Sequence, residues 1–373
     1  MDSVKILHFS DIHFDSPFSE LSVNTAEKRK EDLRETFGKA IDLAKEEKVD
    51  IILLAGDLFD NTTVMKSTLD FMIKKFLDIP HIKIFIAPGN HDPYNTKSFY
   101  NLISWPDNVY IFKESYTNVP LPGLRAVVHG IGFSVPHERE SLLKGIRAQD
   151  DSLINLMVLH GELSRGGAND YNPFTQQEIG DSKMDYIALG HKHDFSGILR
   201  EGSTHYAYSG NVEGRGFDEV GEKGAIIGTV SKNRVDLKFI PLQKRKYIVK
   251  EVDVSGCSTY EELVFRIKGE EEEGCVENLF KIILIGDLPE HFRLNLDILV
   301  SKLKDSFYYV KFVDKTSIAL NLESLMDKFT LKGIFAGSMV KAMEKLEGEE
   351  KELYREALKV GLQALAGGEL KLK

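Results

Sequence analysis

Strand and helix signals alternate through residues 1–90, and this rhythm constrains the fold more than any other feature of the sequence. Apolar runs at Val4–Phe9, Val49–Leu54 and Lys83–Ala87 have the length and composition of buried strands. Between them, apolar residues recur at spacings of three to four within Ala26–Glu47 and around Leu69–Leu77, which predicts two helices. This order predicts right-handed crossovers and a largely parallel sheet.

From Arg125 to Ile240 the signals become mostly strand. The segments are RAVVHG, INLMVL, YIAL, HYAYSG, GAIIGTV and RVDLKFI. Beside the first parallel unit, these strands predict a layered α/β sandwich in which two sheets share a core. Polar and glycine residues stand where the strands end, and in open α/β folds that edge is where ligands bind.

A shift in composition at QKRKYIVK, residues 243–250, marks a candidate domain boundary. Beyond it, the pattern over residues 247–314 is strand, helix, strand, helix, strand. Residues 322–373 have a helical pattern that is interrupted near Gly348. We therefore expect a first domain over residues 1–243, a small second domain over 247–314 and a helical segment over 322–373.

The composition fits a folded protein of the cytoplasm. Of the 373 residues, 42% are hydrophobic and 28% are charged, which is too apolar for a disordered chain. A net charge of −10 argues against binding nucleic acid by bulk charge alone, although it leaves room for a local basic surface. Two cysteines are too few for a disulfide scaffold. We expect no membrane contact, since the chain shows neither a membrane span nor a signal peptide.

Five short polar signatures each follow a predicted strand. Taken singly, none is specific, because a histidine after a strand is usually a hydrogen-bonded structural residue and Gly-Asp is usually a turn. The signatures are Asp11-Ile12-His13, Gly56-Asp57-Leu58-Phe59-Asp60, Gly89-Asn90-His91-Asp92, His160-Gly161 and Gly190-His191-Lys192-His193.

Together the signatures predict a site for two metal ions. Their donors are carboxylates, imidazoles and one carboxamide, a mixture that suits divalent ions such as Mn²⁺, Fe²⁺ or Zn²⁺. Two ions roughly 3.5–4 Å apart clamp a phosphoryl group, with Asp57 suited to bridge them and His91 free to act as general acid or phosphate partner. The seven candidate ligands are Asp11, His13, Asp57, Asn90, His160, His191 and His193.

This order and spacing resemble the calcineurin-like metallophosphoesterase superfamily, whose pattern is D-x-H, GD, GNH, H and GHxH. The resemblance implies a four-layer α/β/β/α sandwich with a dinuclear centre and His91 as the catalytic histidine. It also implies that Asp60 orients that histidine, against the alternative of a turn aspartate. The implied ligand sets are Asp11, His13 and His193 for one ion and Asn90, His160 and His191 for the other, with Asp57 shared.

Within the superfamily, ILHFSDIHFDSP, GDLFD, APGNHDP and LGHKH resemble DNA double-strand-break repair nucleases of the SbcD type and, more closely, the YhaO type. VVHGIGF and YSGNVEGRGFDEVGEKG extend the likeness. It implies a Mn²⁺-dependent exonuclease or endonuclease acting on DNA in repair. It also implies a capping domain at 247–314 and C-terminal helices that dock on the coiled coil of an SMC-type ATPase.

Several alternatives stay open at this point. The same metals would serve a phosphodiesterase or nucleotidase acting on small phosphoesters, although such a substrate needs neither cap nor tail. A non-catalytic scaffold is a third reading, opposed by the complete ligand set. The apolar stripes of the last helix would also suit packing against the chain itself or a homodimer mate. Two residues depart from related nucleases: Asp60 replaces a second histidine, and Asn211 replaces a frequent serine.

Two arginines are candidates for contact with a substrate phosphate. Arg165 lies five residues beyond His160, and Arg215 lies in the segment EGRG. The alternative for Arg165 is a solvated loop residue. For Arg215 it is structural pairing with Glu213 or Asp218.

Overall fold

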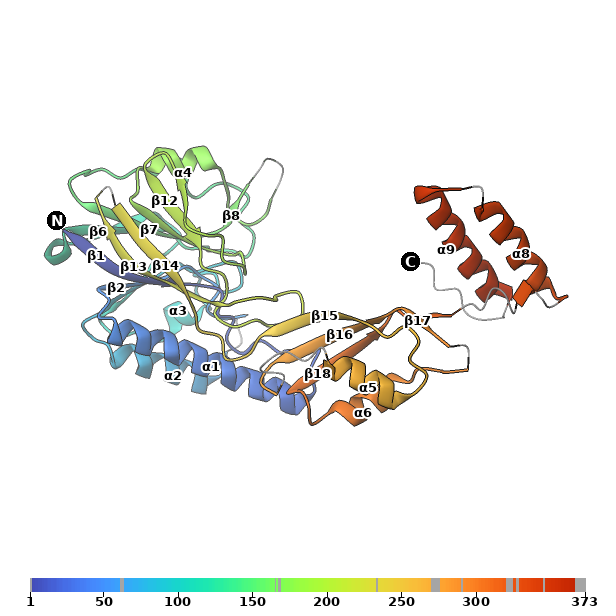
Figure 1. Cartoon of the computed structure of the whole chain (residues 1–373). Coiled ribbons are helices and arrows are strands. Elements are labelled where there is room, and N and C mark those ends of the chain that lie inside the picture. Colours follow the sequence, from blue (N-terminus) through green and yellow to red (C-terminus); the bar gives the residue numbers. More distant parts are fainter. Residues whose placement is uncertain are drawn as a thin grey trace. The chain divides into compact units, whose positions relative to one another are not determined.

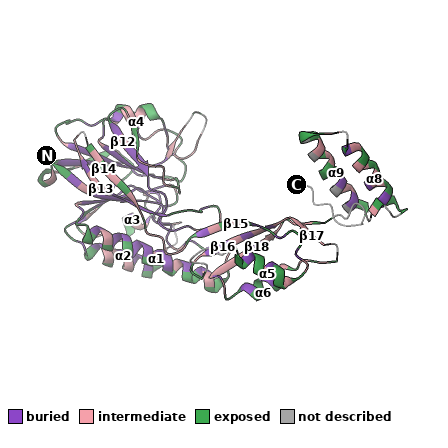
Figure 2. Ribbon diagram, viewed as in Figure 1, coloured by how far each residue is buried: buried purple, intermediate pink, exposed green. Residues whose placement is uncertain are grey.

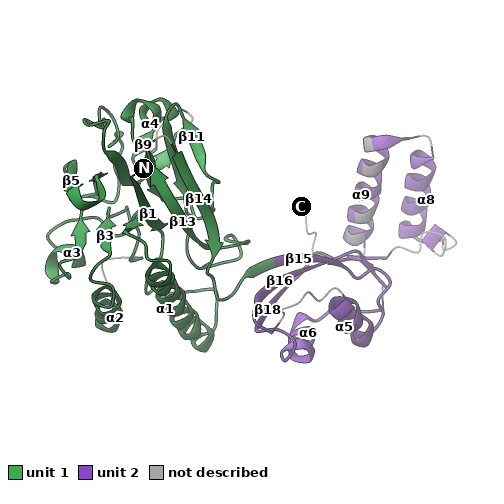
Figure 3. Cartoon of the chain, turned by 60° about the vertical axis from the view of Figure 1, so that its left-hand side comes forward, with its two compact units in different colours: residues 1–248 green, residues 249–373 purple. Residues whose placement is uncertain are grey.

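The computed structural model describes residues 2–60, 64–164, 166, 169–232, 234–269, 276–289, 291–319, 325–326, 329–344 and 346–365. The chain divides into two compact units, residues 1–248 and 249–373 (Figure 3). The predicted segments 247–314 and 322–373 fall almost wholly in the second unit.

One six-stranded sheet of the first unit contains the predicted parallel strands. Parallel pairing joins β1 to β2 and β2 to β3, as the alternating pattern predicts. It also joins β3 to β4, which was not predicted, whereas β13 and β14 extend the sheet in antiparallel fashion. In spatial order the strands are β14 (Arg234–Pro241), β13 (Gly224–Ser231), β1 (Ser3–Phe9), β2 (Ile51–Leu54), β3 (Lys83–Ile86) and β4 (Val109–Ile111).

A second six-stranded sheet is formed by residues 117–208. Its four central strands, β12, β10, β7 and β6, are mutually parallel, and an antiparallel strand closes each edge. In spatial order the strands are β11 (Leu199–Glu201), β12 (Thr204–Tyr208), β10 (Tyr186–Gly190), β7 (Ile154–His160), β6 (Ala126–Gly130) and β5 (Thr117–Leu121).

The two sheets pack face to face, and helices cover their outer faces (Figures 1 and 2). Side chains of β1 point alternately to the two faces of its sheet. Val4 and Ile6 pack in the hydrophobic cluster between the sheets, and Leu7 and Phe9 pack in the cluster under the helices. The helices on the first sheet are α1 (Val23–Glu46) and α2 (Lys66–Leu77), and α4 (Gln176–Ser182) lies on the second. The predicted four-layer α/β/β/α sandwich is therefore confirmed.

Short elements complete the first unit at its edges and loops. They are α3 (Phe99–Leu102), the 3₁₀ turn η1 (Pro122–Leu124), β8 (Glu162–Leu163) and β9 (Pro173–Phe174). β8 and β9 pair in parallel next to the end of β7.

The second unit has the predicted order of strands and helices. A three-stranded sheet has the order β15-β16-β18, with β16 and β18 parallel, and a helical pair follows it. Across the described part of the chain, no helix has the length and apolarity that crossing a bilayer requires. The elements are β15 (Tyr247–Asp253), α5 (Tyr260–Gly269), β16 (Leu279–Ile285), β17 (Asp287–Leu288), α6 (Leu296–Leu303), β18 (Tyr309–Asp314), β19 (Ser317–Ile318), α8 (Leu331–Met343) and α9 (Gly348–Leu365).

Candidate metal centre

Every predicted metal ligand lies at the carboxyl end of a strand. Backbone hydrogen bonds join the segment after β1 to the segment after β2. The amide of Asp11 donates to the carbonyl of Gly56 at 3.0 Å, and the amide of His13 donates to the carbonyl of Asp57 at 3.0 Å. Parallel strands bring their carboxyl ends to one edge, so residues far apart in sequence meet there. Asp11 and His13 follow β1, Asp57 follows β2, Asn90 follows β3, His160 ends β7, and His191 and His193 follow β10.

The turns that carry these ligands are conformationally strained. Asp11, His13 and Asp57 have φ angles of 51°, 51° and 50°, in the left-handed region that costs a non-glycine residue roughly 1–2 kcal/mol. Gly56 precedes Asp57 with φ of 87°, and a Cβ atom there would lie 2.6 Å from Nδ1 of His160. Strain of this kind persists where the surrounding structure holds functional groups in place.

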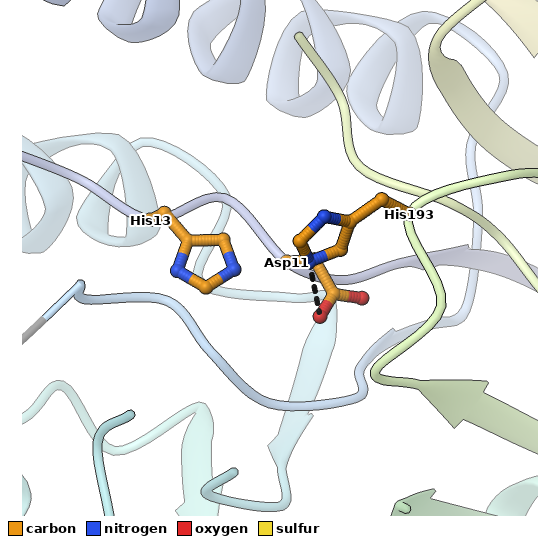
Figure 4. Close-up of side chains that lie close together, drawn as sticks. All are labelled: Asp11, His13 and His193. Carbon is orange, nitrogen blue, oxygen red and sulfur yellow. Dashed lines mark ion pairs between the residues drawn. The ribbon is translucent and has the colours of Figure 1, made fainter. Parts of the chain in front are cut away.

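One set of ligand atoms is formed by Asp11, His13 and His193. The three atoms lie within 4.8 Å of one another. Figure 4 shows the ring of His193 beside the carboxylate of Asp11, with Nε2 of His193 3.8 Å from Oδ1 of Asp11. This is the set that the family resemblance assigns to one ion.

A second set surrounds His160. Its Nε2 atom lies 3.0 Å from Oδ1 of Asn90 and 3.4 Å from Oδ2 of Asp57. Oδ1 of Asn90 is also 3.3 Å from Nδ1 of His191. Oδ2 of Asp57 lies 3.8 Å from Nε2 of His13, so the Asp57 carboxylate faces both sets, as a bridging ligand would.

The side chains of the two sets suit a bound cation. Lone pairs of their nitrogen and oxygen atoms face one another, and no proton lies between them. His160 donates its Nδ1 proton to the carbonyl of Ala55 at 2.8 Å, so its neutral Nε2 presents a lone pair to the oxygens of Asn90 and Asp57. Nε2 of His13 is buried and, among the described residues, has no hydrogen-bond partner. Such an arrangement is unfavourable unless a cation lies among the atoms.

The pKa values of the candidate ligands also favour a bound cation. Burial lowers the pKa of His13 to about 4, against the opposing effect of the hydrogen bond that His13 donates to Asp60, and burial next to His160 lowers the pKa of His191 to about 3. Both imidazoles are therefore neutral at pH 7 and have a lone pair for a metal. Burial, together with the carboxylates of Asp92 and Asp11, raises the pKa of Asp57 well above its usual range. A divalent cation would relieve this crowding of negative charge.

Three histidines are oriented through their Nδ1 atoms. His13 donates to the carboxylate of Asp60 at 3.1 Å, His160 to the carbonyl of Ala55, and His193 to Oε1 of Glu219 at 2.7 Å. Each ring thus turns Nε2 toward the ligand sets, the arrangement typical of metal-binding histidines. Burial is the largest single influence and lowers the pKa of His193, but the hydrogen bond to Glu219 and the charges of Asp11 and Glu219 together outweigh it, so the pKa is raised.

Two residues that the sequence did not single out support the centre. Glu219 holds His193, and Asp92 accepts hydrogen bonds from the backbone amides of Leu58 at 2.7 Å and Gly89 at 2.8 Å. Asp92 thereby joins the loop after β2 to the loop after β3. The available signals were its place directly after Gly-Asn-His and, for Glu219, an acidic residue in a segment that resembles the nucleases.

His91 lies at the solvent side of the centre. Its side chain is 42% exposed, and its ring packs edge-on against that of His13 with centroids 4.7 Å apart. Nδ1 of His91 donates to the backbone carbonyl of Asp60 at 3.1 Å and lies 3.5 Å from the Asp60 carboxylate. Asp60 therefore contacts His91 and also His13, and the sequence alone did not anticipate the contact with His13.

The two candidate arginines have different outcomes. Arg165 lies outside the described residues. Arg215 lies beside the centre and donates to Glu219 and Asp60, at 3.0 and 3.3 Å, rather than to Glu213 or Asp218. Its predicted contact with a substrate phosphate stays a prediction.

Comparison with known proteins gives several sequence relatives, of which two illustrate the range. The chain is 31% identical over 249 residues to the uncharacterized metallophosphoesterase YhaO of Bacillus subtilis (strain 168), covering 64% of this chain and 60% of that protein. It is 27% identical over 259 residues to the DNA double-strand break repair protein Mre11 of Saccharolobus solfataricus, covering 65% and 64%. The chain thus matches less than two thirds of the length of either relative.

The chain was also compared with solved structures and with models of protein families. The crystal structure of TT1561 of Thermus thermophilus aligns with 62% of this chain and 99% of its own at 14% identity and a TM-score of 0.39. A family model described as calcineurin-like phosphoesterase matches residues 4–195, more than half of the chain and all seven predicted ligands. The chain therefore belongs to the calcineurin-like phosphoesterase family.

Proposed function

We propose that the chain is a metal-dependent DNA nuclease of the cytoplasm that hydrolyses phosphodiester bonds in DNA repair, together with an SMC-type ATPase. The observation that carries this proposal is the convergence of seven oxygen and imidazole donors on one strand-end edge, in two sets that share Asp57. The similarity to a protein named for DNA double-strand break repair supports DNA as the substrate class.

The metal requirement follows from the donor set. Mn²⁺ is the expected ion, with Fe²⁺ or Zn²⁺ as alternatives. Two such cations, when bound, supply Lewis-acid polarisation of the phosphodiester and acidification of a water molecule. The chain's own part is to hold the ligands, with the Nδ1 contacts of His13, His160 and His193 fixing three of the rings before a substrate arrives.

His91 is the proposed catalytic residue. Its Nδ1 proton is committed to the carbonyl of Asp60, which fixes the ring and leaves Nε2 for the substrate. When protonated, Nε2 donates a proton to the leaving oxygen or a hydrogen bond to a phosphate oxygen. General acid catalysis of this kind contributes about 10²–10⁴-fold to rate.

The second unit offers a surface for the DNA backbone. Lys281 of β16 and Lys311 of β18 are direct neighbours in the parallel register and lie on the less buried face of the strands. We propose that this face contributes cationic side chains to a contact with the phosphates of DNA. This local pair offsets the objection raised by the net charge of −10.

The helical pair at the C-terminal end is the proposed ATPase-binding element. Leu358 and Leu362 of α9 are buried with Ala336 and Met343 of α8, so one stripe of α9 packs within the chain. The other stripe is left exposed at Leu353, Ala357 and Ala364. A coiled coil would cover it, and a homodimer mate is the alternative. Sedimentation with and without the ATPase, using Leu353→Asp as the variant, distinguishes the two.

The proposal is tested by nuclease assays on linear double- and single-stranded DNA with Mn²⁺, Mg²⁺ or EDTA. DNA should be degraded with Mn²⁺, and both EDTA and His91→Ala should abolish the activity while His91→Ala still binds metal. Intact DNA in the presence of the ATPase partner, with bis-p-nitrophenyl phosphate cleaved, would contradict the DNA assignment.

Hydrolysis of small phosphoesters is the rival function, favoured by the acidic net charge. Salt dependence separates the two, because a contact with several phosphates weakens steeply as salt rises whereas binding of a small ester does not. A flat response between roughly 50 and 200 mM salt would favour the rival.

A further inference from the structure

The two ligand sets are held by different kinds of partner. The histidines of the first set, His13 and His193, donate to the carboxylates of Asp60 and Glu219. His160 of the second set donates to a neutral backbone carbonyl, that of Ala55. A carboxylate partner raises the basicity of an imidazole and fixes its plane more firmly than a carbonyl does.

Arg215 connects the two carboxylates of the first set. One terminal nitrogen of its guanidinium donates to Oδ1 of Asp60 at 3.3 Å, and the other donates to Oε1 of Glu219 at 3.0 Å. Nε also points to Oε1 of Glu219 at 3.3 Å, and the backbone amide of Arg215 donates to Oε2 at 2.8 Å. The side chain is only 19% exposed, so water screens these contacts little.

Both carboxylates need this counter-charge to stay in place. Asp60 and Glu219 come from loops 159 positions apart in sequence and face one guanidinium, whose planar fork suits two acceptors at once. Without the guanidinium, the two carboxylates would repel each other and move apart. Each carboxylate would then displace the histidine that donates to it. Asn211 donates to Oε2 of Glu219 at 2.6 Å and so helps to hold Glu219, but it does not contact Asp60.

We propose that Arg215 is a positioning residue that selectively sustains one cation site, the site of Asp11, His13 and His193, by holding Asp60 and Glu219 against the two histidines. The inference rests on the proposed dinuclear centre. It differs from a substrate contact, because the guanidinium is occupied by protein carboxylates. The second site, built on His160, Asn90 and His191, does not depend on Arg215.

The test is Mn²⁺ binding to the full chain, measured by calorimetry and by electron paramagnetic resonance. Wild type should bind two ions per chain and show the signal of a coupled pair. Arg215→Ala should bind one ion as before and the other about 10–100-fold more weakly, with the coupled signal lost at two equivalents. Glu219→Gln should weaken the same ion, and Arg215→Lys should restore part of the affinity.

A matched control is Arg125→Ala, which removes an exposed arginine paired with Asp2 and should bind both ions as wild type does. Two unchanged ions in Arg215→Ala and Glu219→Gln would overturn the inference while leaving the dinuclear centre intact, and a raised KM alone would assign Arg215 to the substrate. Equal weakening of both ions would also overturn it. Fewer than two ions in wild type would overturn the centre as well.

Discussion

The central strands of the two units differ in how they are covered. β7 of the first unit is buried at all seven positions, whereas β16 of the second alternates between buried and half-buried residues. Helices and a second sheet cover both faces of β7, but α5 and α6 lie against one face of the smaller sheet (Figures 1 and 3). The first unit can therefore present polar chemistry only where its strands end, while the second has a sheet face to offer a partner.

The residues that could bind a metal are distributed in the same way. Every group of described residues that could hold a metal lies in the first unit, at the strand ends. Their loops carry left-handed backbone angles and buried hydrogen bonds, features that cost stability and fix geometry. The candidate metal centre thus belongs to the first unit, and recognition is the part we propose for the second.

The largest expected effect is a loss of stability that is confined to the second unit. Leu284 is fully buried on the covered face of β16, and Leu284→Ala should cost the second unit about 2–5 kcal/mol. Hydrolysis of bis-p-nitrophenyl phosphate by the first unit should not change. Urea unfolding followed alongside activity measures both. Ile283→Ala, on the other face, is the matched control and should cost less; a parallel loss of diester hydrolysis in Leu284→Ala would contradict the division of roles.

The next effect concerns the strand-end edge itself. A Cβ atom at Gly89 would collide with Oδ1 of Asp57, so Gly89→Ala should displace that carboxylate and lower kcat/KM for the diester about 10²-fold. Gly123→Ala is the control, since a Cβ there meets no atom within 4 Å. Steady-state kinetics at saturating Mn²⁺ decides, and equal activity of the two variants would argue against Asp57 as a ligand.

A smaller effect comes from His8, which joins the two sheets. It donates to the carbonyl of Leu189 and accepts from the hydroxyl of Tyr186, and burial lowers the pKa of His8 to about 3. The unfolded chain protonates this residue near pH 6.5 and the folded chain does not, so its stabilising contribution is complete above pH 6.5. It should fall by up to about 1.4 kcal/mol per pH unit between roughly pH 6.5 and 3.

The measurement compares wild type and His8→Asn by urea unfolding in EDTA from about pH 7.5 to 5, a range that spans the titration of an unfolded histidine. The remaining histidines titrate in both proteins, so the difference isolates His8. Wild type should lose stability more steeply as the pH falls. Parallel curves would show that His8 takes up a proton in the folded state.

The smallest effect concerns the open face of the second unit. Lys281→Ala with Lys311→Ala should weaken DNA binding and reduce the slope of log affinity against log salt by about 1 per lysine. Diester hydrolysis should stay unchanged. Lys28→Ala with Lys39→Ala, both exposed on α1, is the charge-matched control. If the control pair lowers the slope as much, the contact with DNA lies elsewhere.

Much of the first unit could be predicted from local sequence. Buried strands such as β2 are continuous apolar runs, and α1 repeats apolar residues at helical spacing, so pattern alone identifies both. The seven candidate ligands could be identified because each stands at or a few residues beyond the end of such a strand. Their convergence then depends only on parallel strand order, which the alternation of strand and helix already implies.

The supporting residues could not be predicted in the same way. Glu219 lies 26 positions beyond His193, with β11 and β12 between them, and Arg215 reaches Asp60 from a segment 155 positions away, so neither contact leaves a periodic signal. Asp60 was expected to serve His91, yet its carboxylate lies closer to His13. These contacts depend on how loops close over the sheet edge, which strand and helix patterns do not encode.

The most direct test of the account is anomalous diffraction at the manganese edge from crystals of the chain grown with Mn²⁺. The account predicts two peaks per chain, one among Asp11, His13 and His193 and one among Asn90, His160 and His191, both adjacent to the carboxylate of Asp57. A single peak, or peaks away from these side chains, would contradict the dinuclear centre on which the proposed function rests.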